Sequence, residues 1–347
     1  MNTFGLTLAN RGVIIGALSV RDLLDMARRA ENSGVFDAVW VGDSMVAKPR
    51  LESVTLLSAL AGVTTKLRLA VGCMATFVHR HPVMFAHQWA SLDLLSEGRS
   101  LLAVCLGGPN EQSAAQALEH QVMGIQANER VARLQEGIVI LRKLFHEEKT
   151  SHHGRFYQFE GLTISPHPVQ NPCPIWIASN PTGLTWKDGA AASDAVVERS
   201  LRRVARYADG WMTNKVTPEQ FREQWSQIRN MAREEGRDPG KLASALYHNI
   251  NVNEDRNAAL AESKAFLDKY YSSNFSAKFV EGFTTAGSPR QCVEELRAYF
   301  AAGLDHITLR MASWDQDRQF RRFVEEVAPA FAKQPGSPAQ VASESGE

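Results

Sequence analysis

Three side chains in polar turns could carry acid–base chemistry. His79 has an unperturbed pKa near neutrality, which suits a general acid or base, although a single loop histidine is also common on protein surfaces. Asp43 follows an apolar run, either as a polar group beside a ligand or as a turn residue that accepts backbone N–H bonds. Glu111 is either a site carboxylate or a solvated loop residue. We take these three as the catalytic candidates.

Small residues follow two other apolar runs. Gly107 and Gly108 would let a planar ring approach the backbone closely, and Asn110 can both donate and accept hydrogen bonds at a pyrimidine edge. Ala75 and Thr76 offer a small side chain and a hydroxyl, and Thr76 is otherwise a plain turn residue. These five residues are predicted to bind a flat heterocyclic ligand.

A third group could hold an anion. Thr213 and Lys215 follow one apolar run and precede Thr217-Pro218, where a helix is expected to begin. Arg310 ends the last run, and it either joins the anion site or pairs with a carboxylate of the fold. A hydroxyl, an ammonium, a guanidinium and a helix N-terminus all favour a phosphate.

These residues follow short apolar runs that read as buried parallel strands, because several runs are apolar on both faces. The eight runs are 4–8, 38–42, 67–72, 100–106, 175–178, 210–213, 243–252 and 306–310. Helix-period segments fill the gaps at 20–32, 52–62, 82–95, 128–146, 198–208, 217–235, 255–270, 289–302 and 317–331. Thr217 and Ser288 are expected N-caps, and Gly98, Gly236 and Gly303 are expected helix stops.

Alternating strands and helices predict a parallel sheet with right-handed crossovers. The count of eight favours a (β/α)8 barrel over a doubly wound open sheet, and no G-x-G-x-x-G follows the first strand. Residues 1–332 are predicted to form this single domain, and the small, polar segment 333–347 to be a disordered tail. The active site of such a barrel lies at the carboxyl ends of its strands.

Two connections around the fifth strand are long. Residues 154–159 are expected to belong to a β-hairpin that precedes it. Residues 180–197 leave its carboxyl end and are interpreted as an insertion that acts as a lid.

Several phrases, in this order along the chain, resemble the luciferase-like monooxygenases. They are Val41-Gly42-Asp43-Ser44, Arg80-His81-Pro82, Ala90 to Arg99, Leu106 to Glu111, Pro174 to Ala178, and Arg203 to Trp211. The resemblance implies a (β/α)8 barrel with reduced FMN or the deazaflavin F420 at the carboxyl face. It also implies a strained, sometimes cis, peptide near Met74-Ala75-Thr76, and cofactor contacts from Thr213 and Lys215. Ala178 and Ser179 are also expected to contact the cofactor. They follow the fifth strand, where this sequence departs from the short Gly-Gly turn of the family.

The resemblance implies an oxidoreductase. The leading expectation is a monooxygenase that uses oxygen and reduced FMN from a separate flavin reductase to oxidise a small organic substrate. The alternative is an F420-dependent reductase or dehydrogenase that transfers a hydride. A non-catalytic flavin-binding accessory protein is a third hypothesis. A sugar-phosphate lyase or isomerase is a fourth, but no predicted strand carries the lysine that Schiff-base chemistry needs.

The composition limits the classes of partner that the protein is expected to have. Lys plus Arg number 38 and Asp plus Glu number 38, so no basic excess exists for nucleic acid. Signal-peptide and membrane-spanning patterns are absent from the sequence, so a cytoplasmic protein without membrane contact is expected. A homodimer or homotetramer is also expected. No metal is expected, because the cysteines lack zinc spacing and the pair His152-His153 precedes the predicted hairpin. Cys73 and Cys105 are interpreted as buried packing residues.

Overall fold

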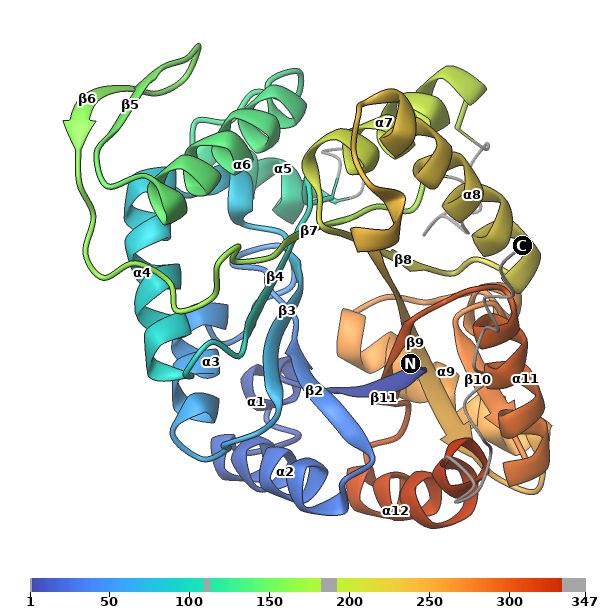
Figure 1. Cartoon of the computed structure of the whole chain (residues 1–347). Helices are drawn as coiled ribbons and strands as arrows, with labels where there is room; N and C mark the ends of the chain where they lie inside the picture. Colours follow the sequence, from blue (N-terminus) through green and yellow to red (C-terminus); the bar gives the residue numbers. More distant parts are fainter. Residues whose placement is uncertain (1, 109–112, 182–191, 333–347) are drawn as a thin grey trace, which may run out of the picture.

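The computed structural model describes residues 2–108, 113–181 and 192–332. Within these ranges, eight parallel strands form a closed barrel with helices around it (Figure 1). The barrel strands are β1 (Thr3–Thr7), β2 (Phe36–Val41), β3 (Arg68–Met74), β4 (Ser100–Val104), β7 (Ile175–Ala178), β8 (Gly210–Asn214), β9 (Ala243–Val252) and β11 (His306–Met311). Neighbours pair in this order, and β11 pairs with both β9 and β1, which closes the ring. The predicted (β/α)8 barrel is confirmed, and the open doubly wound sheet is excluded.

Two tryptophans fill the inside of the barrel. Trp40 and Trp176 are buried with ring centroids 6.1 Å apart. Glycines on neighbouring strands make room for them, because a Cβ on Gly72 would lie 2.6 Å from the Trp40 ring and one on Gly210 would lie 2.5 Å from the Trp176 ring. The lumen is therefore a packed core, as in other barrels of this class.

The longer helices lie where the apolar periodicity predicts them. They are α2 (Val20–Ser33), α3 (Ser53–Ala61), α4 (Pro82–Leu95), α6 (Arg130–His146), α7 (Asp194–Tyr207), α8 (Pro218–Glu234), α9 (Arg256–Tyr271), α11 (Pro289–Ala301) and α12 (Gln316–Arg322). Thr217 and Ser288 each form a capping box, as expected of these N-caps. The predicted stops Gly98, Gly236 and Gly303 all have positive φ.

Two predicted boundaries are wrong. Helix α7 begins at Asp194, inside the segment 180–197 that was interpreted as an insertion, because Ser193 is extended and Asp194 is an acidic residue in the first turn. The last helix was predicted over 317–331, but α12 ends at Arg322 and a π turn (Phe323–Val327) and a 3-10 turn (Ala328–Phe331) follow. Pro329 lacks the N–H that a longer α-helix would need. Residues 182–191 of the predicted lid lie outside the described residues.

Short elements lacked a sequence signal. These are α1 (Arg11–Ile14), α5 (Ala114–Val122), α10 (Ala277–Glu281), β10 (Thr284–Gly287) and the 3-10 turns Phe77–His79 and Pro239–Lys241. The predicted hairpin is present as β5 (Thr150–His153) and β6 (Gln158–Leu162), which extends away from the barrel (Figure 1). Its turn is held by Glu136 of α6, which accepts hydrogen bonds from Phe156 N and Tyr157 N.

The segment after β9 covers part of the carboxyl face. Aromatic side chains of α9 and of the residues up to α10 belong to the same apolar cluster as the barrel lumen: Phe266, Tyr270, Tyr271, Phe275 and Phe279. The Tyr270 hydroxyl accepts a hydrogen bond from Arg11 N, at the start of α1, and the Tyr271 hydroxyl accepts one from Arg310 of β11. These contacts hold α9 against α1 and β11, which lie near the two ends of the chain.

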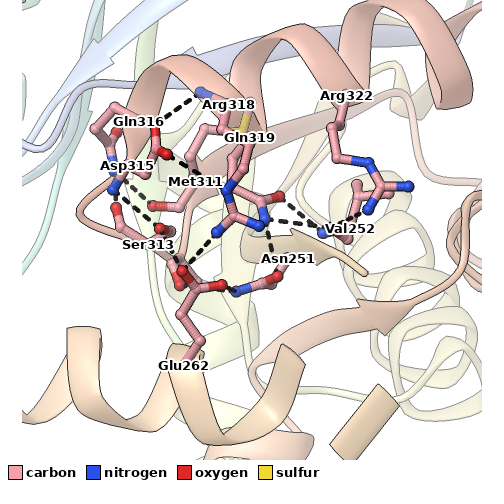
Figure 2. A network of polar contacts seen from close by, with 11 residues as sticks. Asn251, Val252, Glu262, Met311, Ser313, Asp315, Gln316, Arg318, Gln319 and Arg322 are labelled. Atoms are coloured by element: carbon pink, nitrogen blue, oxygen red, sulfur yellow. Dashed lines mark hydrogen bonds and ion pairs between the residues drawn. The ribbon is translucent and has the colours of Figure 1, made fainter. Parts of the chain in front are cut away.

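A polar network joins α9 and α12 to the ends of β9 and β11 (Figure 2). The Glu262 carboxylate accepts hydrogen bonds from Ser313 Oγ, Arg318 Nη2 and Asn251 Nδ2. The buried amide of Gln319 completes the edge of β9, because its Oε1 accepts from Val252 N at 2.8 Å and its Nε2 donates to Asn251 Oδ1 at 2.9 Å. The network fixes the carboxyl ends of the last strands.

Gln319→Leu should therefore lower the free energy of unfolding by about 2–3 kcal/mol, because it leaves Val252 N and Asn251 Oδ1 buried without these partners. Urea unfolding of the two proteins checks this value. Gln88→Leu, on the exposed face of α4, is the matched control and should change stability by no more than about 0.5 kcal/mol. Equal losses in both variants would contradict the role of the Gln319 amide.

Candidate active site

Asp43 is buried at the end of β2 and holds the turn after β3. Its Oδ2 accepts hydrogen bonds from Thr76 N at 2.8 Å and Thr76 Oγ1 at 2.7 Å, and its Oδ1 accepts one from Ser53 Oγ at 3.0 Å. Arg80 Nε in turn donates to Thr76 Oγ1. Asp43 accepts the hydrogen bonds that the turn interpretation expects, and Thr76 shares in this turn, whereas the predicted catalytic role of Asp43 stays a prediction.

His79 and Glu119 form a buried pair. The His79 side chain is 2% exposed, and its Nδ1 lies 3.5 Å from Glu119 Oε1. Burial lowers the pKa of His79, opposed by the charge of Glu119. The ring of His120 packs edge-on against His79 with centroids 5.2 Å apart. The side chain of His79 is therefore shielded from solvent in this structure, and its predicted acid–base role stays a prediction.

The sequence analysis did not identify Glu119. Its side chain positions the loop after β2. Its Oε2 accepts hydrogen bonds from Val46 N and Ala47 N, both at 2.8 Å. It comes from α5, a helix without a clear sequence signal, so nothing in the sequence connected it to residues 44–50.

The glycine turn after β4 lies against the turn after β3. Gly107 has φ 69°, and a Cβ there would lie 3.1 Å from the Ala75 carbonyl oxygen. The Gly108 carbonyl accepts a hydrogen bond of 2.7 Å from Arg130 Nη1. Gly107 and Ala75 thus lie close together, whereas Asn110 and Glu111 lie outside the described residues. The non-proline cis peptide bond of this region is Gly72–Cys73, before the predicted position at 74–76.

The predicted phosphate residues are placed at the end of β8. Thr213 is 1% exposed, and its Oγ1 has no hydrogen-bond partner among the described residues. Lys215 has φ 52°, a conformation that costs a non-glycine residue free energy, and its Nζ lies 5.2 Å from the centre of the Phe279 ring. The capping box of α8 already uses Thr217 N and Gln220 N, and Pro218 has no N–H to offer. A phosphate here would therefore depend on Thr213 and Lys215 more than on the helix end.

The turn after β7 forms hydrogen bonds with the neighbouring strand β8. Ser179 Oγ accepts a hydrogen bond from Trp211 Nε1 at 3.1 Å, and Ser179 N donates to the Met212 carbonyl. Ala178, at the end of the strand, is partly exposed. Cofactor contacts by these two residues stay predictions.

Arg310 is 1% exposed inside a box of tyrosines. Its guanidinium carbon lies 4.3 Å from the centre of the Tyr270 ring and 5.0 Å from that of Tyr247, and its Nη1 donates to the Tyr271 hydroxyl at 2.9 Å. Burial, followed by repulsion from Arg50, lowers its pKa. The carboxylate partner considered for Arg310 is thus replaced by aromatic rings and a phenol.

More basic side chains gather around this box than the sequence indicated. Lys48 Nζ lies 5.3 Å from the centre of the Tyr271 ring, and the Arg50 guanidinium lies 5.7 Å from that of Tyr270. Burial and then the charges of Arg50, Arg11 and Lys215 lower the pKa of Lys48 to about 7. Burial lowers the pKa of Lys215 to about 8. We call Arg11, Lys48, Arg50, Lys215 and Arg310 the basic cluster.

The charge of such a cluster favours an anion as its ligand. Side chains of the same sign at short range raise one another's free energy, and a bound anion removes that cost. The sequence analysis did not identify Lys48 or Arg50; the signal that could have found them is Lys48-Pro49-Arg50 after a strand end, but Arg11 and the tyrosines come from distant segments. Only the closed barrel brings them together.

Cys73 and Cys105, predicted to be buried packing residues, are partly exposed, and their Sγ atoms lie 2.7 Å apart. Among the described residues, no group of three or more His, Cys, Asp or Glu side chains is arranged to hold a metal ion. Likewise, none of the described helices is long and apolar enough to cross a membrane.

Residues 1–185 and 190–306 match the family described as luciferase-like monooxygenase. The chain belongs to this family. The resemblance found in the sequence motifs is thereby confirmed, and the protein is a luciferase-like oxidoreductase.

Similar curated proteins are F420-dependent glucose-6-phosphate dehydrogenases. That of Kineococcus radiotolerans is 22% identical over 88% of this chain and 92% of its own length, and that of Amycolatopsis mediterranei is 24% identical over 89% and 94%. Among solved structures, an F420-dependent secondary alcohol dehydrogenase matches with a TM-score of 0.77 at 19% identity over 96% of this luciferase-like chain and 100% of its own. A monooxygenase from Streptomyces bottropensis matches with a TM-score of 0.75 at 23% identity over 95% and 100%.

Proposed function

We propose that this luciferase-like protein is an F420-dependent oxidoreductase that transfers a hydride between the deazaflavin and a small organic substrate. The F420-dependent relatives over nearly the whole chain favour this alternative over the FMN monooxygenase that was the leading expectation. The observation that carries the proposal is the basic cluster. Five basic side chains offer more positive charge than the single phosphate of FMN would neutralise, and F420 carries a phosphodiester together with glutamate carboxylates.

The residues present fit this cofactor. Gly107 and Ala75 form a surface without bulky side chains, against which a flat ring can lie. The buried Thr213 hydroxyl can donate a hydrogen bond, and Lys215 and Lys48 add basic side chains. When bound, F420 supplies a two-electron hydride donor or acceptor that does not need oxygen. The protein's part is to bind, orient and exclude water, and the aromatic side chains of α9 and α10 serve the last of these.

Titration of the purified protein with F420 and with FMN tests the proposal. F420 should bind at least about tenfold more tightly, a difference of about 1.4 kcal/mol. Turnover of an accepted substrate with F420 should continue without oxygen. If the protein instead binds reduced FMN preferentially and requires oxygen, the monooxygenase function is the correct one and this proposal is wrong.

The pH dependence of F420 affinity should report Lys48. An anion beside Lys48 favours its charged form, so the pKa of about 7 in the free protein rises on binding and a proton is taken up. Affinity should therefore be constant below pH 7 and weaken above it by up to about tenfold per pH unit, until the pKa of the complex is reached.

Calorimetric titrations with F420 between pH 6 and pH 9 measure this profile. Lys48→Met should move the onset of the decline to about pH 8, where Lys215 loses its proton. An onset that stays near pH 7 in Lys48→Met would show that another group is responsible.

A further inference from the structure

Two thiols meet at the carboxyl ends of neighbouring strands. Cys73 lies in β3 and Cys105 directly follows β4, and Cys105 N donates a hydrogen bond to the Met74 carbonyl. Both residues are partly exposed, and the two Sγ atoms lie 2.7 Å apart. An S–S bond is about 2.05 Å long, so the sulfurs need to approach by less than about 1 Å to form one. The 31 residues between them explain why the sequence showed no cysteine motif.

We propose that Cys73 and Cys105 form a redox-active dithiol, a modification site at which a peroxide converts the pair into an intramolecular disulfide. The site lies beside the candidate cofactor surface, since the turns that follow β3 and β4 carry Ala75 and Gly107. The thiol chemistry is independent of the proposed function.

The reaction balances with hydrogen peroxide as oxidant. The Cys73 thiolate attacks one peroxide oxygen, the O–O bond breaks, and Cys73 sulfenic acid and hydroxide form. Cys105 sulfur then attacks Cys73 sulfur, the S–S bond forms and the S–O bond breaks. The two thiol protons end in water, so two thiols and one peroxide give one disulfide and two waters. Two electrons pass from the sulfurs to the peroxide.

Electrostatics favours Cys73 as the attacking sulfur. The hydrogen bond with Cys105 lowers the pKa of Cys73, and this effect outweighs burial and the charge of Asp43, which both raise it. The same hydrogen bond raises the pKa of Cys105. The other two cysteines are buried, and burial raises the pKa of Cys173 and of Cys292 to about 12. They serve as internal references that share the chain and its conditions.

The first experiment maps thiols in the reduced full-length protein. Iodoacetamide should alkylate Cys73 at least about tenfold faster than Cys173 or Cys292, because the thiolate is the nucleophile. After hydrogen peroxide, two free thiols should be lost, the mass should fall by about 2 Da, and a peptide pair linked through Cys73 and Cys105 should appear. Reduction with dithiothreitol should restore both thiols. Peroxide treatment that leaves both thiols free, or that oxidises Cys73 only to sulfinic acid, would overturn the proposal.

Variants distinguish the pair from general oxidation. Cys105→Ser should abolish the cross-link and leave a sulfenic acid on Cys73 that dimedone traps. Cys292→Ser is the matched control and should cross-link as the parent protein does. If Cys105→Ser and Cys292→Ser give the same products, Cys73 and Cys105 do not act as a dithiol pair.

A second arm rests on the proposed function. The Gly107 turn is already in close contact with Ala75, so drawing β3 and β4 together must shift this surface. The oxidised protein should therefore bind F420 less tightly than the reduced protein, and dithiothreitol should restore binding. Equal affinity of the two forms would overturn this regulatory role. If neither form binds F420 while the cross-link forms, the proposed cofactor is wrong and the dithiol remains.

Discussion

Replacing Lys215 with Ala should weaken F420 binding by about 1.5–3 kcal/mol, the range for hydrogen bonds to charged groups, or roughly 10- to 150-fold in Kd. Lys215 is held in a left-handed backbone conformation at the end of β8, with its ammonium over the Phe279 ring. Backbone conformations of this kind persist where the surroundings require them, often at ligand sites. Turnover at saturating F420 should change little, because the interaction is the same in the ground and transition states.

The side chain of F420 provides the control for this prediction. The deazaflavin ring system without its phosphodiester tail should bind the parent protein and Lys215→Ala equally. Lys241→Ala, on the surface between α8 and β9, should leave both affinities unchanged. Equal losses for F420 and the tailless deazaflavin would show that Lys215 does not contact the phosphate.

The barrel was predictable because its strands and helices carry local signals. Buried parallel strands such as β4 read as apolar runs, and α8 carries its own start signal in Thr217-Pro218. Elements of four or five residues, such as α1 and α10, are too short for a periodic pattern. They are formed by tertiary packing, which a single sequence does not display.

The candidate site was predictable only where it follows strand ends. Thr213, Lys215 and Gly107 were found in this way, because the carboxyl ends of parallel strands meet at one face. Tyr270 and Tyr271 were not, since they end a helix that begins on that face and packs over it. Asp43 shows the opposite case, because a strand-end carboxylate turned out to bind the Thr76 turn.

The loop that carries Lys48 and Arg50 should depend on Glu119. The buried Glu119 carboxylate accepts two hydrogen bonds from this loop, at Val46 N and Ala47 N. Glu119→Ala removes both and leaves the two N–H groups without that partner. The free energy of unfolding should fall by about 3–6 kcal/mol, twice the range for one hydrogen bond to a charged group. Urea unfolding measures this loss, and Glu119→Gln should retain part of the stability because an amide oxygen still accepts.

A second carboxylate in the same fold separates stability from binding. Glu31 of α2 likewise accepts hydrogen bonds from the backbone of Thr65, Lys66 and Leu67, but that loop precedes β3 and lies at the opposite end of the barrel. Glu31→Ala should destabilise the fold and leave F420 affinity unchanged. Glu119→Ala should in addition weaken F420 binding roughly three- to tenfold, because the loop then holds Lys48 in place for only a fraction of the time. If both variants lose stability and neither loses affinity, the loop after β2 does not contribute to the cofactor site, and the basic cluster must act through Lys215 and Arg310.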